Sequence, residues 1–165
     1  MGSSSKKSTV GYRYYMGLHF GVCHGPVDSV NNITVGERNA WTGEQTVSGA
    51  VTVNAPELFG GDSREGGVAG TLDVMMGEPA QAQNSYLASL LGVGIPAFRG
   101  ILSAVWRGGQ VSANNPYVKP WAFRVFRVLK GWTGDAPWYP AKAKIGGYVD
   151  LPVGGWSSTN VTGNN

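Results

Sequence analysis

The fold is decided by two alternating segments and the loop that joins them: Thr46-Val-Ser-Gly-Ala-Val-Thr-Val-Asn-Ala-Pro-Glu-Leu-Phe-Gly-Gly-Asp-Ser-Arg-Glu-Gly-Gly-Val-Ala-Gly-Thr-Leu-Asp-Val-Met-Met76. In 46–54 and again in 68–76, apolar residues and glycine alternate with polar residues. Successive side chains of a strand point to opposite faces, so this period of two predicts two strands with one buried face each. The loop between them is rich in glycine and charge and carries a Leu58-Phe59 pair that looks exposed, which is typical of a loop that makes contacts.

The same alternation extends upstream over Val10–Val22, where every even position is apolar or aromatic. Glycines at 11, 17 and 21 predict that this long strand is curved or broken in two. Asp28–Val35 predicts the next short strand, and the following residues 36–39 predict a turn.

Downstream, Ala80–Leu91 predicts the single helix, with Leu87, Leu90 and Leu91 on one face and Gly92 at its C-terminal end. Gly108-Gly109 separates two further strand segments and predicts a two-residue hairpin turn. Trp121–Leu129 is apolar on both faces apart from two arginines, which predicts a central strand.

Six or seven strands with one short helix predict a mainly β domain, built as a barrel or a sandwich. We expect a flexible N-terminal lead over 1–9, a β-rich domain over 10–139, and a Gly- and Trp-rich extension with a polar tail over 140–165.

Composition narrows the classes of function. Charged residues are 14% of the chain, against about a quarter in ordinary domains, and 26 glycines and 18 aromatic residues accompany them. This composition suits a β protein that covers much of its surface with partners. The net charge of +3 is scattered, so specific nucleic-acid binding is not expected. We expect no membrane span and no signal peptide, and therefore synthesis in the cytoplasm of the producing cell.

His19, Cys23 and His24 are the only metal-ligand candidates of the Cys and His type. Zinc takes four ligands, or three and a water. In an extended segment His19 and Cys23 would lie roughly 13 Å apart, and His24 would point to the opposite face. No metal within one chain and no cofactor are therefore expected, whereas a metal shared between subunits stays open.

Two alternative functions stay open beside an assembly role. Tryptophans such as Trp132 and Trp138 could stack on sugars, which would make the chain a carbohydrate-binding module. Carboxylates lie on both sides of the loop, at Glu57, Asp62, Glu65, Asp73 and Glu78. A cell-wall hydrolase would need two of them to face each other across a cleft, and nothing in the sequence fixes such a pair. We therefore expect no enzyme activity.

Six segments together resemble one protein family. They are Gly11-Tyr-Arg-Tyr-Tyr-Met-Gly-Leu-His19, Cys23-His-Gly-Pro-Val-Asp28, Ala55–Gly67, Asp73-Val-Met-Met-Gly-Glu-Pro79, Pro96-Ala-Phe-Arg-Gly100 and Ser112-Ala-Asn-Asn-Pro-Tyr-Val-Lys-Pro-Trp-Ala-Phe-Arg124. In this order they resemble the N-terminal region of the large tail-tip proteins of long-tailed bacteriophages, of the host-specificity or tip-attachment type related to the lambda central tail fibre protein. The resemblance covers roughly Val10 to Tyr139.

The resemblance implies a structural virion protein at the distal end of the tail, made in the cytoplasm of the host bacterium. It implies a homotrimeric hub of barrel-like domains that joins the sixfold tail tube to a threefold tip and helps to close the DNA channel. The implied partners are further copies, the distal tail protein ring, other tail-tip proteins and the C-terminus of the tape measure protein. Members of the family are much longer than 165 residues, so receptor recognition is not assigned to this chain, which could be a split, truncated or partial hub.

The expected subunit or ring contacts are the Glu57–Glu65 loop and the Asn114–Trp121 loop, because glycines permit close approach and apolar residues offer anchors there. The candidate interface residues are Glu57, Leu58, Phe59, Asp62, Arg64, Glu65, Asn114, Asn115, Tyr117, Lys119 and Trp121.

Overall fold

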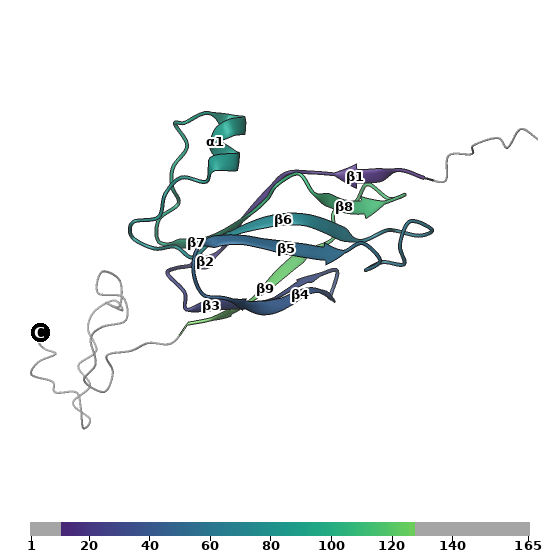
Figure 1. The fold of residues 1–165 in the computed structure, drawn as a ribbon, viewed down its shortest axis with the longest axis horizontal. Helices are drawn as coiled ribbons and strands as arrows, with labels where there is room; N and C mark the ends of the chain where they lie inside the picture. Colours follow the sequence, from purple (N-terminus) through teal and green to yellow (C-terminus); the bar gives the residue numbers. More distant parts are fainter. Residues whose placement is uncertain (1–10, 128–165) are drawn as a thin grey trace, which may run out of the picture. The chain divides into compact units, whose positions relative to one another are not determined.

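The computed structural model of this chain describes residues 11–127, which form two antiparallel sheets and one helix (Figure 1). The strands are β1 (Arg13–Tyr15), β2 (Leu18–His24), β3 (Ser29–Val35), β4 (Arg38–Gln45), β5 (Gly49–Ala55), β6 (Val68–Met75), β7 (Ile101–Trp106), β8 (Gln110–Ala113) and β9 (Trp121–Phe126), and the helix is α1 (Ser85–Leu91). The prediction of a mainly β fold with one short helix is confirmed. The predicted boundaries at residues 9 and 139 lie outside the described residues.

The first sheet contains β1, β2 and β5–β8, and β6 is its central strand. β5 pairs along one edge of β6 over its full length, without a bulge. Their pairing confirms the two strands predicted on either side of the loop. In both strands the valines that face the second sheet are buried, among them Val51, Val53 and Val74.

β7 and β8 follow one another along the other edge of β6, in the pairs Leu72↔Trp106 and Ala69↔Gln110. Gly108-Gly109 therefore does not turn the chain back, and the predicted hairpin is wrong. The register slips by one residue between these pairs, so the glycines form a bulge inside one long strand. Gly108 has a φ of 64°, a conformation that glycine adopts without strain.

β1 and β2 form a second long strand that pairs with β8 and then β7. The break falls around Gly17, and the Met16 amide still donates to the Gly109 carbonyl at 3.2 Å. This confirms the prediction of a long strand broken in two. Leu18 and Phe20 point inward and are half-buried, whereas His19 between them is exposed, as the alternation predicted.

The second sheet has the order β4-β3-β9, and β3 confirms the strand predicted over 28–35. β4 was missed, because its sequence, Arg-Asn-Ala-Trp-Thr-Gly-Glu-Gln, does not alternate. β9 is an edge strand among the described residues, so the prediction of a central strand is wrong. Only one of its faces is half-buried, and Arg124 on the other face is exposed.

Aromatic side chains join the two sheets. Trp106 of β7 is fully buried, and its ring lies 5.2 Å from the ring of Trp121 on β9. Phe20 of β2 lies 5.2 Å from Trp121 and 5.7 Å from Phe123. Burial of each large apolar side chain contributes about 1.5–3 kcal/mol, so this cluster is a main source of stability for a sandwich-like pair of sheets.

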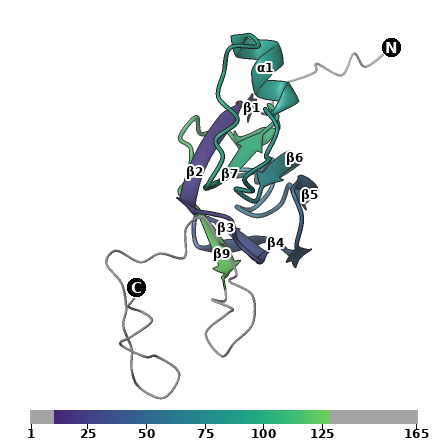
Figure 2. The same cartoon turned by 90° about the vertical axis from the view of Figure 1, so that its left-hand side faces the viewer.

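The helix belongs to an excursion of the chain, residues 77–100, between β6 and β7. Leu87 packs with Met75 and Val105 on the outer face of the first sheet, so the excursion covers the part of that face over β6 and β7 (Figure 2). The predicted helix is confirmed with a later start, since Asn84 caps it by accepting a hydrogen bond from the Leu87 amide at 3.0 Å. Of the three leucines predicted to share a face, only Leu87 is buried.

Side-chain amides fasten this excursion. Gln81 is buried: its oxygen accepts from the Gly77 amide at 2.7 Å, and its nitrogen donates to the Ala97 and Phe98 carbonyls. Asn84 donates to the buried Asp73 carboxylate at 2.7 Å. These bonds satisfy backbone groups that would otherwise cost free energy on burial.

Replacing Asn84 by alanine should lower the free energy of unfolding by about 2–3 kcal/mol, because the variant loses a helix cap and removes one donor from a buried carboxylate. Urea denaturation measures this change. The matched control is Ser89→Ala on the exposed side of the same helix, which should stay within about 0.5 kcal/mol of the parent. Equal effects of the two substitutions would contradict the role given to Asn84.

Candidate assembly surface

The structure brings the two predicted contact loops together at one end of the sandwich. We call this surface the loop end and define it as residues 11–13, 36–38, 56–66 and 114–120. The β5–β6 loop contributes 56–66, and the β8–β9 connection contributes 114–120. In Figure 1 these segments lie away from α1, which marks the other end of the first sheet.

Asn114 connects the segments of the loop end through hydrogen bonds. Its side-chain nitrogen donates to the carbonyls of Asp62 and Arg64 at 2.8 and 2.7 Å. Its side-chain oxygen accepts from the Tyr12 amide at 3.3 Å, and its own amide donates to the Tyr12 carbonyl at 2.8 Å. Asn114 has a φ of 57°, a conformation that asparagine tolerates better than most residues. One side chain thus links three segments that are far apart in the sequence.

Glu65 is held by the second loop. Lys119 contacts one carboxylate oxygen at 2.9 Å, and the Asn115 side chain donates to the other at 2.7 Å. The hydrogen bond from Lys119, followed by that from Asn115, lowers the pKa of Glu65. The Lys119 ammonium also lies 4.8 Å from the centre of the Phe59 ring, a cation–π contact.

Arg13 and Asp62 form an ion pair that ties the start of β1 to the same loop. The hydrogen bonds that Arg13 donates to the Asp62 carboxylate lower the pKa of Asp62 and raise the pKa of Arg13. Both side chains are about half exposed, at 53% and 55%, so the pair contributes little to stability and mainly orients the loop.

The backbone of the β5–β6 loop is itself ordered by hydrogen bonds. The Phe59 amide donates to the Gly66 carbonyl at 2.7 Å, and the Gly66 amide donates to the Gly61 carbonyl at 2.8 Å. A side chain at Gly67 would collide with the Ala55 carbonyl oxygen. The close approach of these two residues, where the β5–β6 loop begins and finishes, therefore requires glycine at position 67.

The candidate residues differ in how they are placed. Glu57, Asp62, Arg64, Asn114 and Tyr117 are exposed, whereas Leu58, Glu65, Asn115, Lys119 and Trp121 are half-buried and Phe59 is buried. The expectation of an exposed Leu58-Phe59 pair is wrong for Phe59, which is 8% exposed and belongs to the core. Trp121 likewise packs on Trp106. The side chains of Phe59 and Trp121 therefore pack against other residues of the same chain and are not free to contact a partner.

Sequence reasoning missed the contribution of the N-terminal segment to this surface. Tyr12 is 69% exposed, and Arg13 reaches the β5–β6 loop. Together with Tyr117 at 75% and Val118 at 39% exposure, Tyr12 gives the loop end its exposed apolar area. The sequence places Tyr12 on the even, inward face of a strand, and only its position at the strand's beginning could have suggested exposure.

The candidate metal ligands do not form a cluster. His19, Cys23 and His24 all lie along β2, and the His19 ring packs edge-on against Phe98 at 4.6 Å. His19 is exposed overall, but partial desolvation of its ring lowers its pKa. Among residues 11–127, no group of three or more His, Cys, Asp or Glu is placed to hold a metal ion.

The carboxylates predicted around the loop are also separated. Glu57, Asp62 and Glu65 lie at the loop end, whereas Asp73 lies toward the far end of β6 and Glu78 follows that strand. Asp73 forms an ion pair with Arg107 through two hydrogen bonds of 2.8 and 2.6 Å. This pairing raises the pKa of Arg107.

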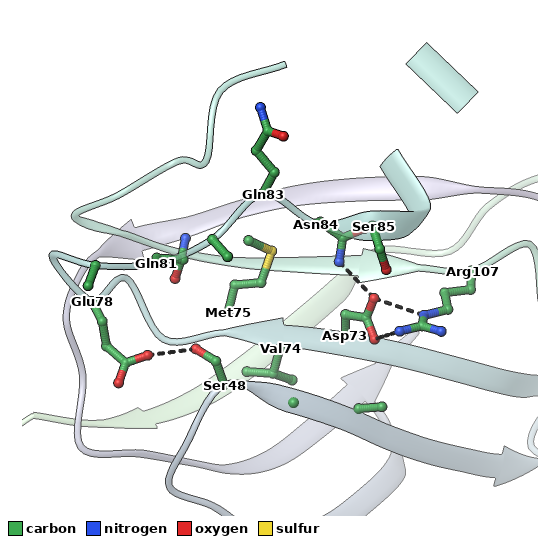
Figure 3. Close-up of a pocket in the computed structure, with 14 residues that line it drawn as sticks. Ser48, Asp73, Val74, Met75, Glu78, Gln81, Gln83, Asn84, Ser85 and Arg107 are labelled. Atoms are coloured by element: carbon green, nitrogen blue, oxygen red, sulfur yellow. Dashed lines mark hydrogen bonds and ion pairs between the residues drawn. The ribbon is translucent and has the colours of Figure 1, made fainter. Parts of the chain in front are cut away.

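A groove of about 470 Å³ lies between the start of β5 and residues 78–85 (Figure 3). The Asp73–Arg107 pair forms one part of its wall, and a hydrogen bond of 2.9 Å from Ser48 to Glu78 forms another. Its lining contains neither His nor Cys. Asp73 and Arg107 are paired with each other, and Glu78 is bonded to Ser48, which is an arrangement suited to holding the excursion on the sheet.

Comparison with known proteins adds no relative: no protein-family model matches the chain, and no curated protein matches it either. No helix within residues 11–127 is long and apolar enough to cross a membrane.

Acid should weaken the loop end. The pKa values of Asp62 and Glu65 are lowered in the folded state, so their contribution to stability is complete above their unfolded pKa values, at about pH 4–4.5, and is lost as the pH falls further. The double variant Asp62→Asn, Glu65→Gln should therefore lose less stability than the parent between about pH 5 and 3. Denaturation at a series of pH values measures both slopes. Glu44→Gln, an exposed position on β4 outside the loop end, is the control and should keep the parent's slope.

Proposed function

We propose that this chain is a structural subunit of the tail tip of a long-tailed bacteriophage, part of the hub that joins the end of the tail tube to the tip. The observation that carries the proposal is the loop end. Two loops predicted as contacts lie side by side, fastened by Asn114 and by the ion pairs of Glu65 and Asp62.

A surface ordered before binding loses less conformational entropy when it is covered by a partner. At the loop end, polar bonds fix the backbone while Tyr12, Tyr117 and Val118 stay exposed. Exposed tyrosines with a polar surround are typical of protein–protein interfaces. These features support an assembly role for this end of the sandwich.

The resemblance to tail-tip proteins supports the same surface. Three of the six resembling segments contribute to the loop end: those that begin at Gly11, at Ala55 and at Ser112. Two others, Asp73–Pro79 and Pro96–Gly100, include the two ends of the helical excursion. The proposed partners are two further copies in a trimer, the distal tail protein ring, other tip proteins and the tape measure C-terminus. The proposed location is the distal end of the tail.

No observation on residues 11–127 favours the two alternatives. Trp132 and Trp138, which motivated sugar binding, lie outside the described residues. Trp106 and Trp121 pack in the core rather than forming an exposed platform. For a hydrolase, two carboxylates would have to act across one cleft. Asp73 and Glu78 do line the same groove, but Asp73 is bonded to Arg107 and Asn84, and Glu78 accepts from Ser48.

An antibody against this chain should label the distal tail end of purified virus particles in electron microscopy. If the chain is buried in the tip, label should appear after mild disruption, and mass spectrometry should detect the chain in intact particles. Absence of the chain from particles would contradict the proposed function.

Replacing the exposed Tyr117 by alanine should reduce incorporation of the chain into particles by about tenfold or more, because an aromatic anchor of the proposed interface is lost. Incorporation is measured by complementing a phage that lacks the gene for this chain. The control is Leu90→Ala on α1, which is also exposed, at 61%, but lies outside the loop end. Normal incorporation of the Tyr117→Ala chain would show that the loop end is not part of the assembly interface.

A further inference from the structure

The first sheet has two open edges within the described residues. Counted as continuous strands, its order is β5, β6, then β7 with β8, then β1 with β2. β5 pairs only with β6, and β1 pairs only with β8. The unpaired amides and carbonyls of an edge strand are a template for another strand, so natural sheets protect their edges by bulges, prolines, charged residues or a covering segment.

Four of the edge strands carry such protection. β1 contains Arg13, and its register with β8 shifts between Tyr14 and Tyr15. β4 contains Arg38 and Glu44 and pairs irregularly with β3. β9 contains Arg124, and β2 has an irregular register after Gly21. β5 has none of these features: its sequence, Gly-Ala-Val-Thr-Val-Asn-Ala, has no charge and no proline, and it pairs with β6 in continuous register. An unprotected, regular edge of seven residues is expected to be covered in the functional state.

The opposite edge of the same sheet exposes apolar side chains. Around β1, Tyr12 is 69%, Tyr15 62% and Met16 40% exposed. The one charged side chain there, Arg13, is paired with Asp62 in its own loop. This edge therefore offers aromatic contacts rather than repulsion to an incoming strand.

The strand directions make the two edges compatible. Every pairing in the first sheet is antiparallel, so the directions alternate across its four continuous strands. β5 and β1 consequently run in opposite directions. When copies are related by a rotation about an axis along the strands, β5 of one copy meets β1 of the next as an antiparallel pair. A contact between two different edges repeats from copy to copy and closes into a ring when the rotation permits.

We propose that the first sheet continues from one copy of this chain to the next, with β5 of one copy pairing antiparallel to β1 of its neighbour. The proposal deepens the assembly role and rests on the self-association part of it. The paired stretch is limited to about Gly49–Ala55, since Pro56 has no amide hydrogen to donate and Ser48 is bonded to Glu78. The neighbour's Tyr12 and Tyr15 supply the apolar contact.

Two single-cysteine chains test this contact in a Cys23→Ser background, because the natural Cys23 is exposed. One chain carries Thr52→Cys at the middle of β5, and the other carries Met16→Cys directly after β1. Each is treated with a short bismaleimide, alone and in an equal mixture. The proposed contact gives a crosslinked pair in the mixture only, because both cysteines face each other only where β5 of a Thr52→Cys chain meets β1 of a Met16→Cys chain.

Two controls make the result specific. Thr71→Cys replaces Thr52→Cys on the neighbouring strand β6, directly opposite in the register, and should give no crosslink with Met16→Cys. Thr52→Lys should weaken self-association by about tenfold or more, because it places a charge on the pairing edge. Thr42→Lys on the already charged strand β4 should leave self-association unchanged.

Three results would overturn the proposal. Crosslinking of Thr52→Cys with itself would mean that two β5 strands pair around a twofold axis. A parent chain that stays monomeric at all accessible concentrations would mean that no copy covers the edge. Self-association without a crosslink in the mixture would place the contact elsewhere. Labelling of virus particles tests the proposed location separately, so a wrong location and a wrong contact are distinguishable.

Discussion

The contact between Trp106 and Trp121 fixes the position of most other parts of this protein. One tryptophan ends β7 in the first sheet and the other begins β9 in the second, so their packing at 5.2 Å joins the two layers. The same contact holds both ends of the segment 107–120, which contains the bulge, β8 and one of the two loops of the loop end. Because both ends of the segment are anchored in the core, Asn114 and Lys119 reach the β5–β6 loop with little remaining freedom.

The long connections on this framework are held mainly by neutral amides. Asn114 and Asn115 hold the loop end, and Gln81, Gln83 and Asn84 hold the helical excursion. An amide both donates and accepts hydrogen bonds, and its burial costs much less than burial of an unpaired charge. This explains how a chain with only 14% charged residues fixes long loops, and it leaves few charges to oppose contact with partners.

The two proposals concern different surfaces of one molecule. The loop end presents tyrosines on a backbone that is already ordered, and the edges of the first sheet present backbone groups on β5 and apolar side chains near β1. Tyr12 belongs to both surfaces, because it opens the first long strand and bonds to Asn114. An assembly in which neighbours cover the edges would therefore also bring loop ends of neighbouring copies close to one another.

The sequence by itself determined β2, β5 and β6 and their buried faces, since alternation along these strands shows which side chains point inward. It also determined the helix end at Gly92 and selected the two loops that meet at the loop end.

Only the tertiary structure decided which strands are neighbours. Gly108-Gly109 suits a hairpin turn and a bulge equally, and the pairing of β7 and β8 along β6 selected the bulge. Trp121–Leu129 looked central because it is apolar, yet among residues 11–127 its strand β9 pairs only with β3 and is an edge strand. Phe59 looked like a contact residue, and it is buried because the loop folds back over the core. Alternation along a strand is a local property, whereas strand order and loop direction depend on residues far away in the chain.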